Sequence, residues 1–113
     1  MTAAPRVSVV IRSYNRLPAL CELVTALLRQ RHDSFEIVVV EQSTQRPADA
    51  DAALAGLAAD PRLRLVRVPP LGGARARNLG VEHSRGALLV FIDDDDLPGG
   101  DDVLAGIERP FAD

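Results

Sequence analysis

Four short apolar runs, alternating with segments of helical character, constrain the fold more than any other feature of this 113-residue chain. The runs cover residues 7–11, 35–40, 63–68 and 87–92 and are rich in valine, isoleucine and leucine. Continuous apolar runs of this length are typical of strands that are buried on both faces. The alternation therefore predicts an α/β fold: a Rossmann-like, mostly parallel sheet of about four strands with helices on both faces.

The segments between the runs carry helical signals. Residues 17–31 place apolar side chains on one helical face, at Leu20, Leu23, Val24, Leu27 and Leu28. Residues 48–59 are rich in alanine and leucine, and residues 74–83 follow a glycine pair that would open a third helix. Residues 103–108 are expected to begin a fourth.

The length of the chain suits one domain, residues 1–113, with one modest core. No apolar run approaches the roughly 20 residues that a membrane span needs, and the N-terminus lacks the apolar stretch of a signal peptide. We therefore expect a cytoplasmic protein without a transmembrane segment. Cys21 is the only cysteine, so no internal disulfide can form. With His32 and His83 expected on the surface, the sequence shows no zinc cluster.

Charge is unevenly distributed along the chain, whose net charge is −3. Residues 1–92 carry 12 arginines against 8 acidic residues, whereas residues 93–113 carry one arginine against 8. The acidic end could attract cations and the arginines could meet an anion. No nucleic-acid partner is expected. The chain has no lysine and no acidic pair after its first strand, which argues against a P-loop protein and a phospho-receiver domain.

A polar segment directly follows each predicted strand. These segments are residues 12–16, 41–44, 71–77 and 93–96. Ligands of open parallel sheets bind at the carboxyl ends of the strands. Since the strands are parallel, chain direction alone places all four segments at this edge, where we expect the functional site.

Four consecutive aspartates, Asp93 to Asp96, end the last apolar run. Carboxylates packed so closely repel one another, and a bound cation would relieve that repulsion. Their hard oxygen atoms suit Mg²⁺ or Mn²⁺, and aspartates at i and i+2 could meet one ion. A solvated acidic turn is the alternative, but the position at a strand end argues against it.

Three other segments are ambiguous when taken alone. Residues 72–80 could hold an anion at a helix N-terminus, or form a plain loop-to-helix junction. Glu41 and Gln42 could bind a base or ribose, or belong to a capped turn. Tyr14 could stack on a planar ring, or lie in a turn in which Asn15 caps the next helix.

Four stretches taken together resemble the family-2 glycosyltransferases of the GT-A fold: VSVVIRSYNR (7–16), EIVVVEQS (36–43), ARNLG (76–80) and FIDDDD (91–96). They occur in the family's order and cover nearly the whole chain. The resemblance implies a metal-dependent, inverting glycosyltransferase with Mn²⁺ or Mg²⁺ as cofactor. It would transfer a sugar from a nucleotide-diphospho-sugar, with a UDP-sugar favoured, to an acceptor that the sequence does not identify.

The resemblance also implies roles for individual residues. Tyr14 and its neighbours would line the base pocket, and Asp94 would lie close to the ribose or sugar. The metal ligands would be Asp93 and Asp95, with Asp95 the leading one. The implied nucleotide-sugar site comprises Ser13, Tyr14, Glu41, Gln42, Arg77, Asp93 and Asp94.

Two residues depart from the family's pattern: Arg12 replaces the usual proline, and Gln42 replaces the second acid of an acidic pair. The second change leaves the base open. No residue matches the family's catalytic base, which suggests a truncated GT-A domain that lacks the acceptor half. A non-catalytic nucleotide- or metal-binding module is the alternative function. Uncovered sheet edges would favour a homodimer or association with a further segment.

Overall fold

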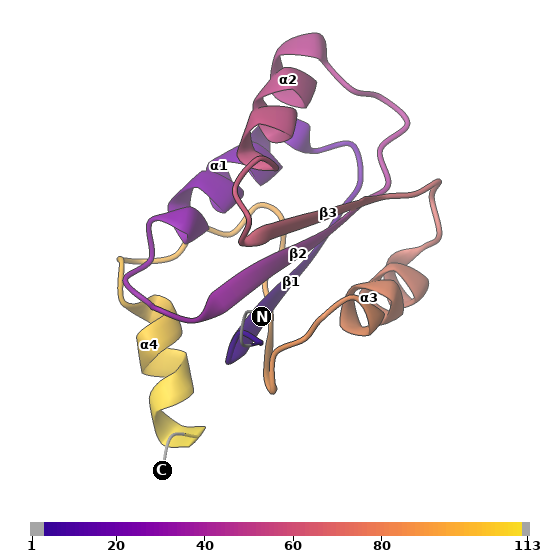
Figure 1. Cartoon of the computed structure of the whole chain (residues 1–113). Coiled ribbons are helices and arrows are strands. Elements are labelled where there is room, and N and C mark those ends of the chain that lie inside the picture. Colours follow the sequence, from indigo (N-terminus) through magenta and orange to yellow (C-terminus); the bar gives the residue numbers. More distant parts are fainter. Residues whose placement is uncertain (1–3, 112–113) are drawn as a thin grey trace.

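The computed structural model describes residues 4–111, which form one sheet covered by helices (Figure 1). The elements follow one another as β1 (Val7–Ser13), α1 (Leu17–Leu28), β2 (Phe35–Glu41), α2 (Ala48–Leu57), β3 (Leu63–Arg67), α3 (Gly73–Glu82), β4 (Leu88–Phe91), α4 (Val103–Glu108) and a 3-10 turn (Arg109–Phe111). Every strand and helix predicted from the sequence is present, with ends that shift by a few residues.

The sheet has the order β3-β2-β1-β4, and all of its pairings are parallel. The first strand of the chain is therefore central, with Val9 opposite Ile37 on one side and Val90 on the other. The edges are formed by β3 and β4. This arrangement confirms the parallel α/β sheet that the apolar runs predict.

Helices cover both faces of the sheet (Figure 1). On the face of α1 and α2, alternate β1 residues such as Val9 and Ile11 join one core with Leu54 of α2 and Leu104 of α4. On the other face lies α3. A Cβ atom at Gly80 would come within 2.5 Å of Val10 Cγ1, so α3 packs this close to the sheet only because residue 80 lacks a side chain.

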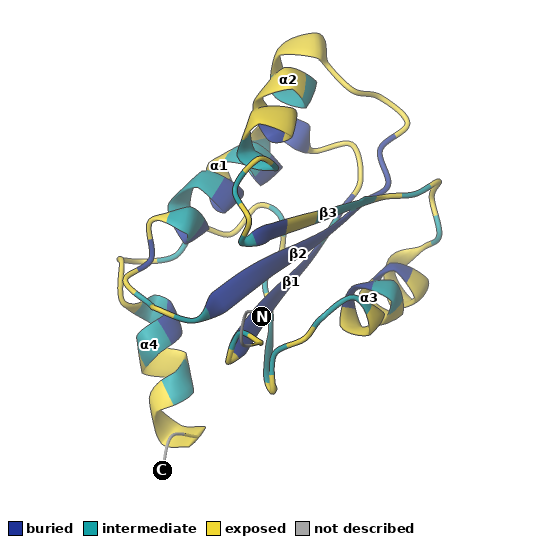
Figure 2. Cartoon of the chain, viewed as in Figure 1, coloured by how far each residue is buried: buried dark blue, intermediate teal, exposed yellow. Residues whose placement is uncertain are grey.

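Burial is greatest in the middle of the sheet, where β2 is buried along its whole length and β1 along nearly all of it (Figure 2). Each buried valine, leucine or isoleucine side chain contributes about 1.5–3 kcal/mol relative to an exposed one. The edge strand β4 is only partly buried. The carboxyl ends of the central strands thus extend from the most stable part of the molecule.

A hydrogen-bond network joins the strands at the amino end of the sheet. The buried carboxylate of Glu36 accepts hydrogen bonds from Ser8 Oγ (2.6 Å) and from Arg85 N (2.7 Å) and Nε (3.2 Å). Ser8 Oγ in turn accepts one from Gly86 N (2.8 Å). Burial alone would raise the pKa of Glu36, but these donors outweigh it and hold the pKa below its usual value. This amino-end network anchors the start of β4.

The structure differs from the sequence-based expectations at two places. The helix expected over residues 17–31 ends at Leu28, followed by its C-cap, Arg29. The prediction that His32 lies on the surface is wrong, because its side chain is only 2% exposed and its Nε2 lies 2.7 Å from Glu108 Oε1. That contact comes from α4, which returns to the loop between α1 and β2. Within residues 4–111, no helix is long and apolar enough to span a bilayer.

Candidate functional site

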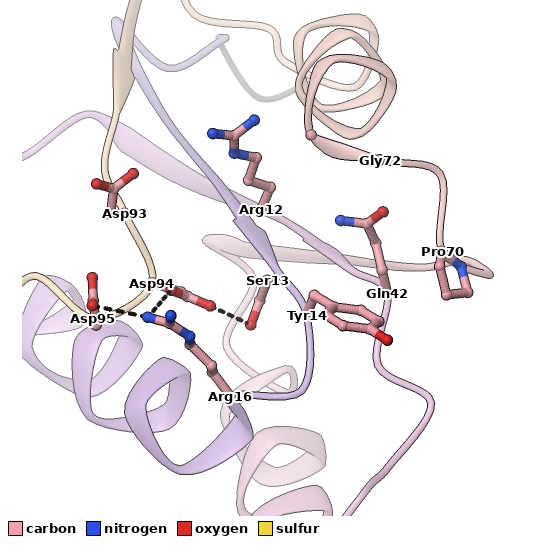
Figure 3. Close-up of a pocket in the computed structure, with 11 residues that line it drawn as sticks. Arg12, Ser13, Tyr14, Arg16, Gln42, Pro70, Gly72, Asp93, Asp94 and Asp95 are labelled. Carbon is pink, nitrogen blue, oxygen red and sulfur yellow. Dashed lines mark hydrogen bonds and ion pairs between the residues drawn. The ribbon is translucent and has the colours of Figure 1, made fainter.

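The carboxyl ends of β1, β2 and β4 surround a single cavity together with the loop that follows β3 (Figure 3). Its volume of about 620 Å³ is in the usual range of small-molecule sites. The residues that line it are mostly polar or charged: Arg12, Ser13, Tyr14, Arg16, Gln42, Pro70, Gly72, Gly73, Asp93, Asp94 and Asp95. The polar segments that follow β1, β2 and β4 therefore meet the loop after β3 in this cavity. It lies at the carboxyl edge of the sheet, where the sequence predicted the functional site.

The loop between β1 and α1 places Tyr14 in the lining of the cavity. The side chain is 51% exposed, so a face of its ring is accessible. The next residue, Asn15, has a φ of 54°, a conformation that asparagine tolerates better than most residues. Its side-chain oxygen accepts hydrogen bonds from the backbone N–H groups of Thr44 (2.9 Å) and Gln45 (3.0 Å). Asn15 thus ties two loops together and holds Tyr14 in place; it does not cap α1.

Glu41, at the end of β2, belongs to the fold and not to the cavity. Its side chain is fully buried and accepts hydrogen bonds from Ser43 N (2.5 Å), Arg46 Nε (3.1 Å) and Arg67 Nη1 (3.3 Å). These three donors use the oxygen atoms that the sequence analysis assigned to a base or ribose. The carboxylate orders the start of the loop that leads to α2.

Gln42, the next residue, points the other way and lines the cavity (Figure 3). Its side-chain oxygen accepts a hydrogen bond from the backbone N–H of Leu71 (2.8 Å). The residue is only 5% exposed, so this contact is well sheltered. Gln42 therefore connects the end of β2 to the loop that leads into α3.

The aspartates after β4 contact the loop after β1. Ser13 Oγ donates a hydrogen bond to Asp94 Oδ2 (3.0 Å). Arg16 Nη1 lies 2.9 Å from Asp95 Oδ2 and 3.7 Å from Asp94 Oδ1. Burial raises the pKa of Asp94, as do the neighbouring Asp93 and Asp95, and together they outweigh the opposing effects of Ser13 and Arg16.

Three exposed carboxylates lie close enough together to share one cation. Asp93, Asp95 and Asp96 each offer an oxygen atom, and these atoms all lie within 4.8 Å of one another. Oxygen ligands of one ion at 2.0–2.6 Å would have such spacings, and the hard carboxylate set suits Mg²⁺ or Mn²⁺. The sequence analysis assigned Asp93 and Asp95 to a metal, and the structure adds Asp96 to this acidic cluster.

The start of α3 forms the remaining wall. Gly72 has a φ of 85°, which glycine adopts without strain. A Cβ atom at Gly73 would overlap the guanidinium of Arg12, so Arg12 packs against the first turn of α3. Arg77 faces elsewhere: its guanidinium carbon lies 5.5 Å from the ring centroid of Phe91, beside a much smaller cavity.

The sequence-predicted residues thus divide into two groups. The cavity brings together Ser13, Tyr14, Gln42, Asp93, Asp94 and Asp95, whereas Glu41 and Arg77 lie outside its lining. Sequence reasoning placed Arg12, Arg16, Gly72 and Gly73 in segments at this edge but did not include them in the implied nucleotide-sugar site, and it did not consider Pro70 as a site residue. The only hint in the sequence was that Arg12 replaces the family's usual proline. Whether its side chain reaches the cavity depends on the pleat of β1, which the sequence does not show.

A family model described as glycosyl transferase family 2 matches residues 8–109. The chain belongs to glycosyltransferase family 2. A succinoglycan biosynthesis protein of Rhizobium meliloti, ExoO, is 33% identical over 96% of this chain. The family expected from the four sequence stretches is therefore confirmed.

Solved glycosyltransferases share the fold. A mannosyltransferase from Pyrobaculum calidifontis, in complex with GDP-Man and Mn²⁺, is 32% identical and matches 99% of this chain with a TM-score of 0.84. S. aureus TarS in complex with UDP-GlcNAc matches 92% with a TM-score of 0.77 at 23% identity, which shows the fold alone. These likenesses confirm the GT-A fold. This chain spans 30% of the length of ExoO and 34% of the mannosyltransferase.

Proposed function

We propose that this chain is the donor-binding part of a metal-dependent glycosyltransferase that uses a nucleotide-diphospho-sugar. The observation that carries the proposal is the cavity itself, in which an acidic cluster lies opposite Tyr14 and Gln42 across the end of β1. A metal end and a base end at the two sides of one cavity suit a ligand with a diphosphate at one end and a planar ring at the other. The mannosyltransferase neighbour, in complex with GDP-Man and Mn²⁺, supports this reading.

Asp93, Asp95 and Asp96 would hold the cation, with Asp95 as the leading ligand. A bound Mn²⁺ or Mg²⁺ would neutralise charge on the diphosphate as it leaves the sugar. Arg16 forms an ion pair with Asp95, and its guanidinium would place a positive charge beside the same diphosphate. The nearby Asp94, held by Ser13, would contact the ribose or the sugar.

The base would lie between Tyr14 and the end of β2. The exposed ring of Tyr14 offers a stacking surface, and Gln42 offers the polar contact. Roles for Glu41 and Arg77 in nucleotide binding stay predictions from the family resemblance; the buried bonds of Glu41 favour a structural role instead.

The catalytic base and an inverting outcome are expectations from the family. Within residues 4–111, no carboxylate matches the position expected for that base, so deprotonation of the acceptor is not assigned to a residue of this chain. The alternative is therefore a module that binds nucleotide and metal without turnover.

Calorimetric titration with GDP, UDP, CDP and dTDP, each with Mn²⁺ and with EDTA, tests the donor site. We expect metal-dependent binding that Asp95→Asn weakens at least about tenfold, an effect of about 1.4 kcal/mol. Asp49→Asn, which removes an exposed charge in the first turn of α2, is the matched control and should bind as the wild type does. Binding that ignores EDTA and Asp95→Asn would contradict the proposal.

A radiolabelled-sugar assay separates the enzyme from the binding module. Sustained transfer or hydrolysis by this chain alone would rule out the non-catalytic alternative. Binding without turnover would favour it. Light scattering on the same sample tests the expected homodimer, which a clean monomer would contradict.

A further inference from the structure

We infer that Gln42 presents a hydrogen-bond donor to the base, and that the site selects a base with two adjacent acceptors on one edge. The inference rests on the proposed function, because it assigns the base specificity of that same cavity. It departs from the sequence-based expectation of a UDP-sugar.

The orientation of the Gln42 amide is fixed by its contact with Leu71. The N–H of Leu71 can only donate, so the atom 2.8 Å away must be the amide oxygen. The usual ambiguity between the oxygen and nitrogen of a glutamine side chain is thereby removed. Figure 3 shows the oxygen on the side of the loop and the nitrogen on the side of Arg12.

The amide nitrogen is left for a ligand. Among the described residues it has no hydrogen-bond partner, and it is not among the buried atoms that lack one. Because Gln42 lines the cavity and its oxygen is taken by Leu71, we infer that the amide nitrogen is the polar atom that faces that space. A bound molecule must therefore offer an acceptor at this point.

The surroundings of Gln42 add a second donor and no carboxylate. Arg12 lines the same cavity, its guanidinium packs against the first turn of α3, and within residues 4–111 it forms no ion pair. The carboxylate of Glu41 is turned into the fold. The aspartates follow β4, on the far side of β1 from β2. The base end of the cavity thus offers donors from two side chains.

Bases differ in what they offer to such a site. Guanine presents O6 and N7 as neighbouring acceptors, a pair that arginine reads well. Cytosine presents O2 and N3 in the same way. Uracil and thymine instead carry an imide N–H between their carbonyl groups, and that donor would face other donors. The shared chemistry is an acceptor pair, which either guanine or cytosine supplies.

The test exchanges the donor for an acceptor without disturbing the loop. In Gln42→Glu one carboxylate oxygen can still accept the Leu71 N–H, while the other replaces the amide nitrogen. Affinities of the whole chain for GDP, CDP and UDP with Mn²⁺ are measured by calorimetry. They are compared as ratios, because the added negative charge weakens the binding of every nucleoside diphosphate. Gln45→Glu is the control, since it adds the same charge on an exposed residue outside the cavity lining.

We expect the wild type to bind GDP or CDP at least about tenfold more tightly than UDP, the effect of a single good base contact. Gln42→Glu should shift that ratio toward UDP by about tenfold, and Gln45→Glu should leave it unchanged. The GDP and CDP arms show which base supplies the acceptor pair. Tightest binding of UDP to the wild type, or a ratio unaffected by Gln42→Glu, would overturn this inference but leave the donor site standing. Failure of all three nucleotides to bind would overturn both.

Discussion

The pKa values of two carboxylates, one at each end of the sheet, are shifted in opposite directions. At the amino end, the single carboxylate of Glu36 receives hydrogen bonds from Ser8 and Arg85, and its pKa is held below the usual value. At the carboxyl end, the partly buried Asp94 lies between two other aspartates, and its pKa is raised. Glu36 lies on the fully buried strand β2, whereas Asp94 follows the edge strand β4.

The difference indicates what each end is for. The amino-end network leaves its buried charge well satisfied, as expected where a carboxylate serves only to hold strands together. The acidic cluster keeps its repulsion, although a single asparagine would relieve part of it. Groups that weaken a fold without structural benefit are typical of functional sites. Substitutions at the two ends should therefore differ in magnitude and in sign.

The largest effect is expected from Glu36→Ala. The change leaves donors of Ser8 and Arg85 without their acceptor, and we expect the free energy of unfolding to fall by about 2–4 kcal/mol. Denaturant titration measures it, with Glu82→Ala on the exposed side of α3 as the control. The pKa of Glu36 is lower in the fold than in the unfolded chain, so its contribution is present above the unfolded value and disappears as the pH falls through the folded one. A loss below about 1 kcal/mol at neutral pH would contradict the structural role of the network.

A smaller loss is expected from Gly86→Ala in the same network. The new Cβ would lie 2.6 Å from Ser8 Oγ and 2.7 Å from Ser8 N, so the chain must shift, and we expect a loss of about 1–3 kcal/mol. Gly56→Ala in α2 is the matched control. It meets nothing within 4 Å and should stabilise the helix by about 0.5–1 kcal/mol. Equal thermal midpoints for the two variants would show that the amino end is not tightly packed.

The smallest effect, and one of opposite sign, is expected from Asp94→Asn. In EDTA at pH 7 the variant should gain up to about 1 kcal/mol, because a partly buried charge is removed and Ser13 keeps an acceptor. The pKa of Asp94 is raised in the fold. The difference in free energy of unfolding between Asp94→Asn and the wild type should therefore grow as the pH rises through that pKa and disappear at lower pH. Asp60→Asn, which breaks an ion pair with Arg62, should instead lose stability. A clear destabilisation by Asp94→Asn would show that the Asp94 carboxylate serves the fold and not a ligand.

The sequence predicts the elements well because the apolar runs alternate with segments of helical periodicity, and the runs at residues 7–11 and 35–40 become the buried central strands β1 and β2. It also predicts which edge holds the site, since parallel strands end at a common edge. The strand order is not accessible in this way, because residues 7–11 and 35–40 are equally apolar and either could be central. His32 was assigned to the surface for a related reason: its partner, Glu108, comes from α4, far along the chain.

Within the site, sequence reasoning identified segments better than individual side chains. Glu41 and Gln42 are adjacent polar residues at a strand end, and only the three-dimensional contacts with Arg67 and Leu71 show which one is structural. Arg77 belongs to residues 72–80, which could have held an anion, but its guanidinium lies over the ring of Phe91 and outside the lining of the cavity. Such choices depend on contacts across 26 or more residues, which no local pattern contains.

The strand order also has a consequence for how the chain is made. Of the four described strands, the central strand β1 is synthesised first and its neighbour β4 is synthesised last. Until β4 pairs with it, one edge of β1 carries unsatisfied backbone groups at the centre of the future sheet. The pairing of β4 closes that edge and also brings Asp94 to Ser13 and Asp95 to Arg16. A nascent chain therefore acquires its acidic cluster only when β4 pairs with β1, after the other three described strands have been made.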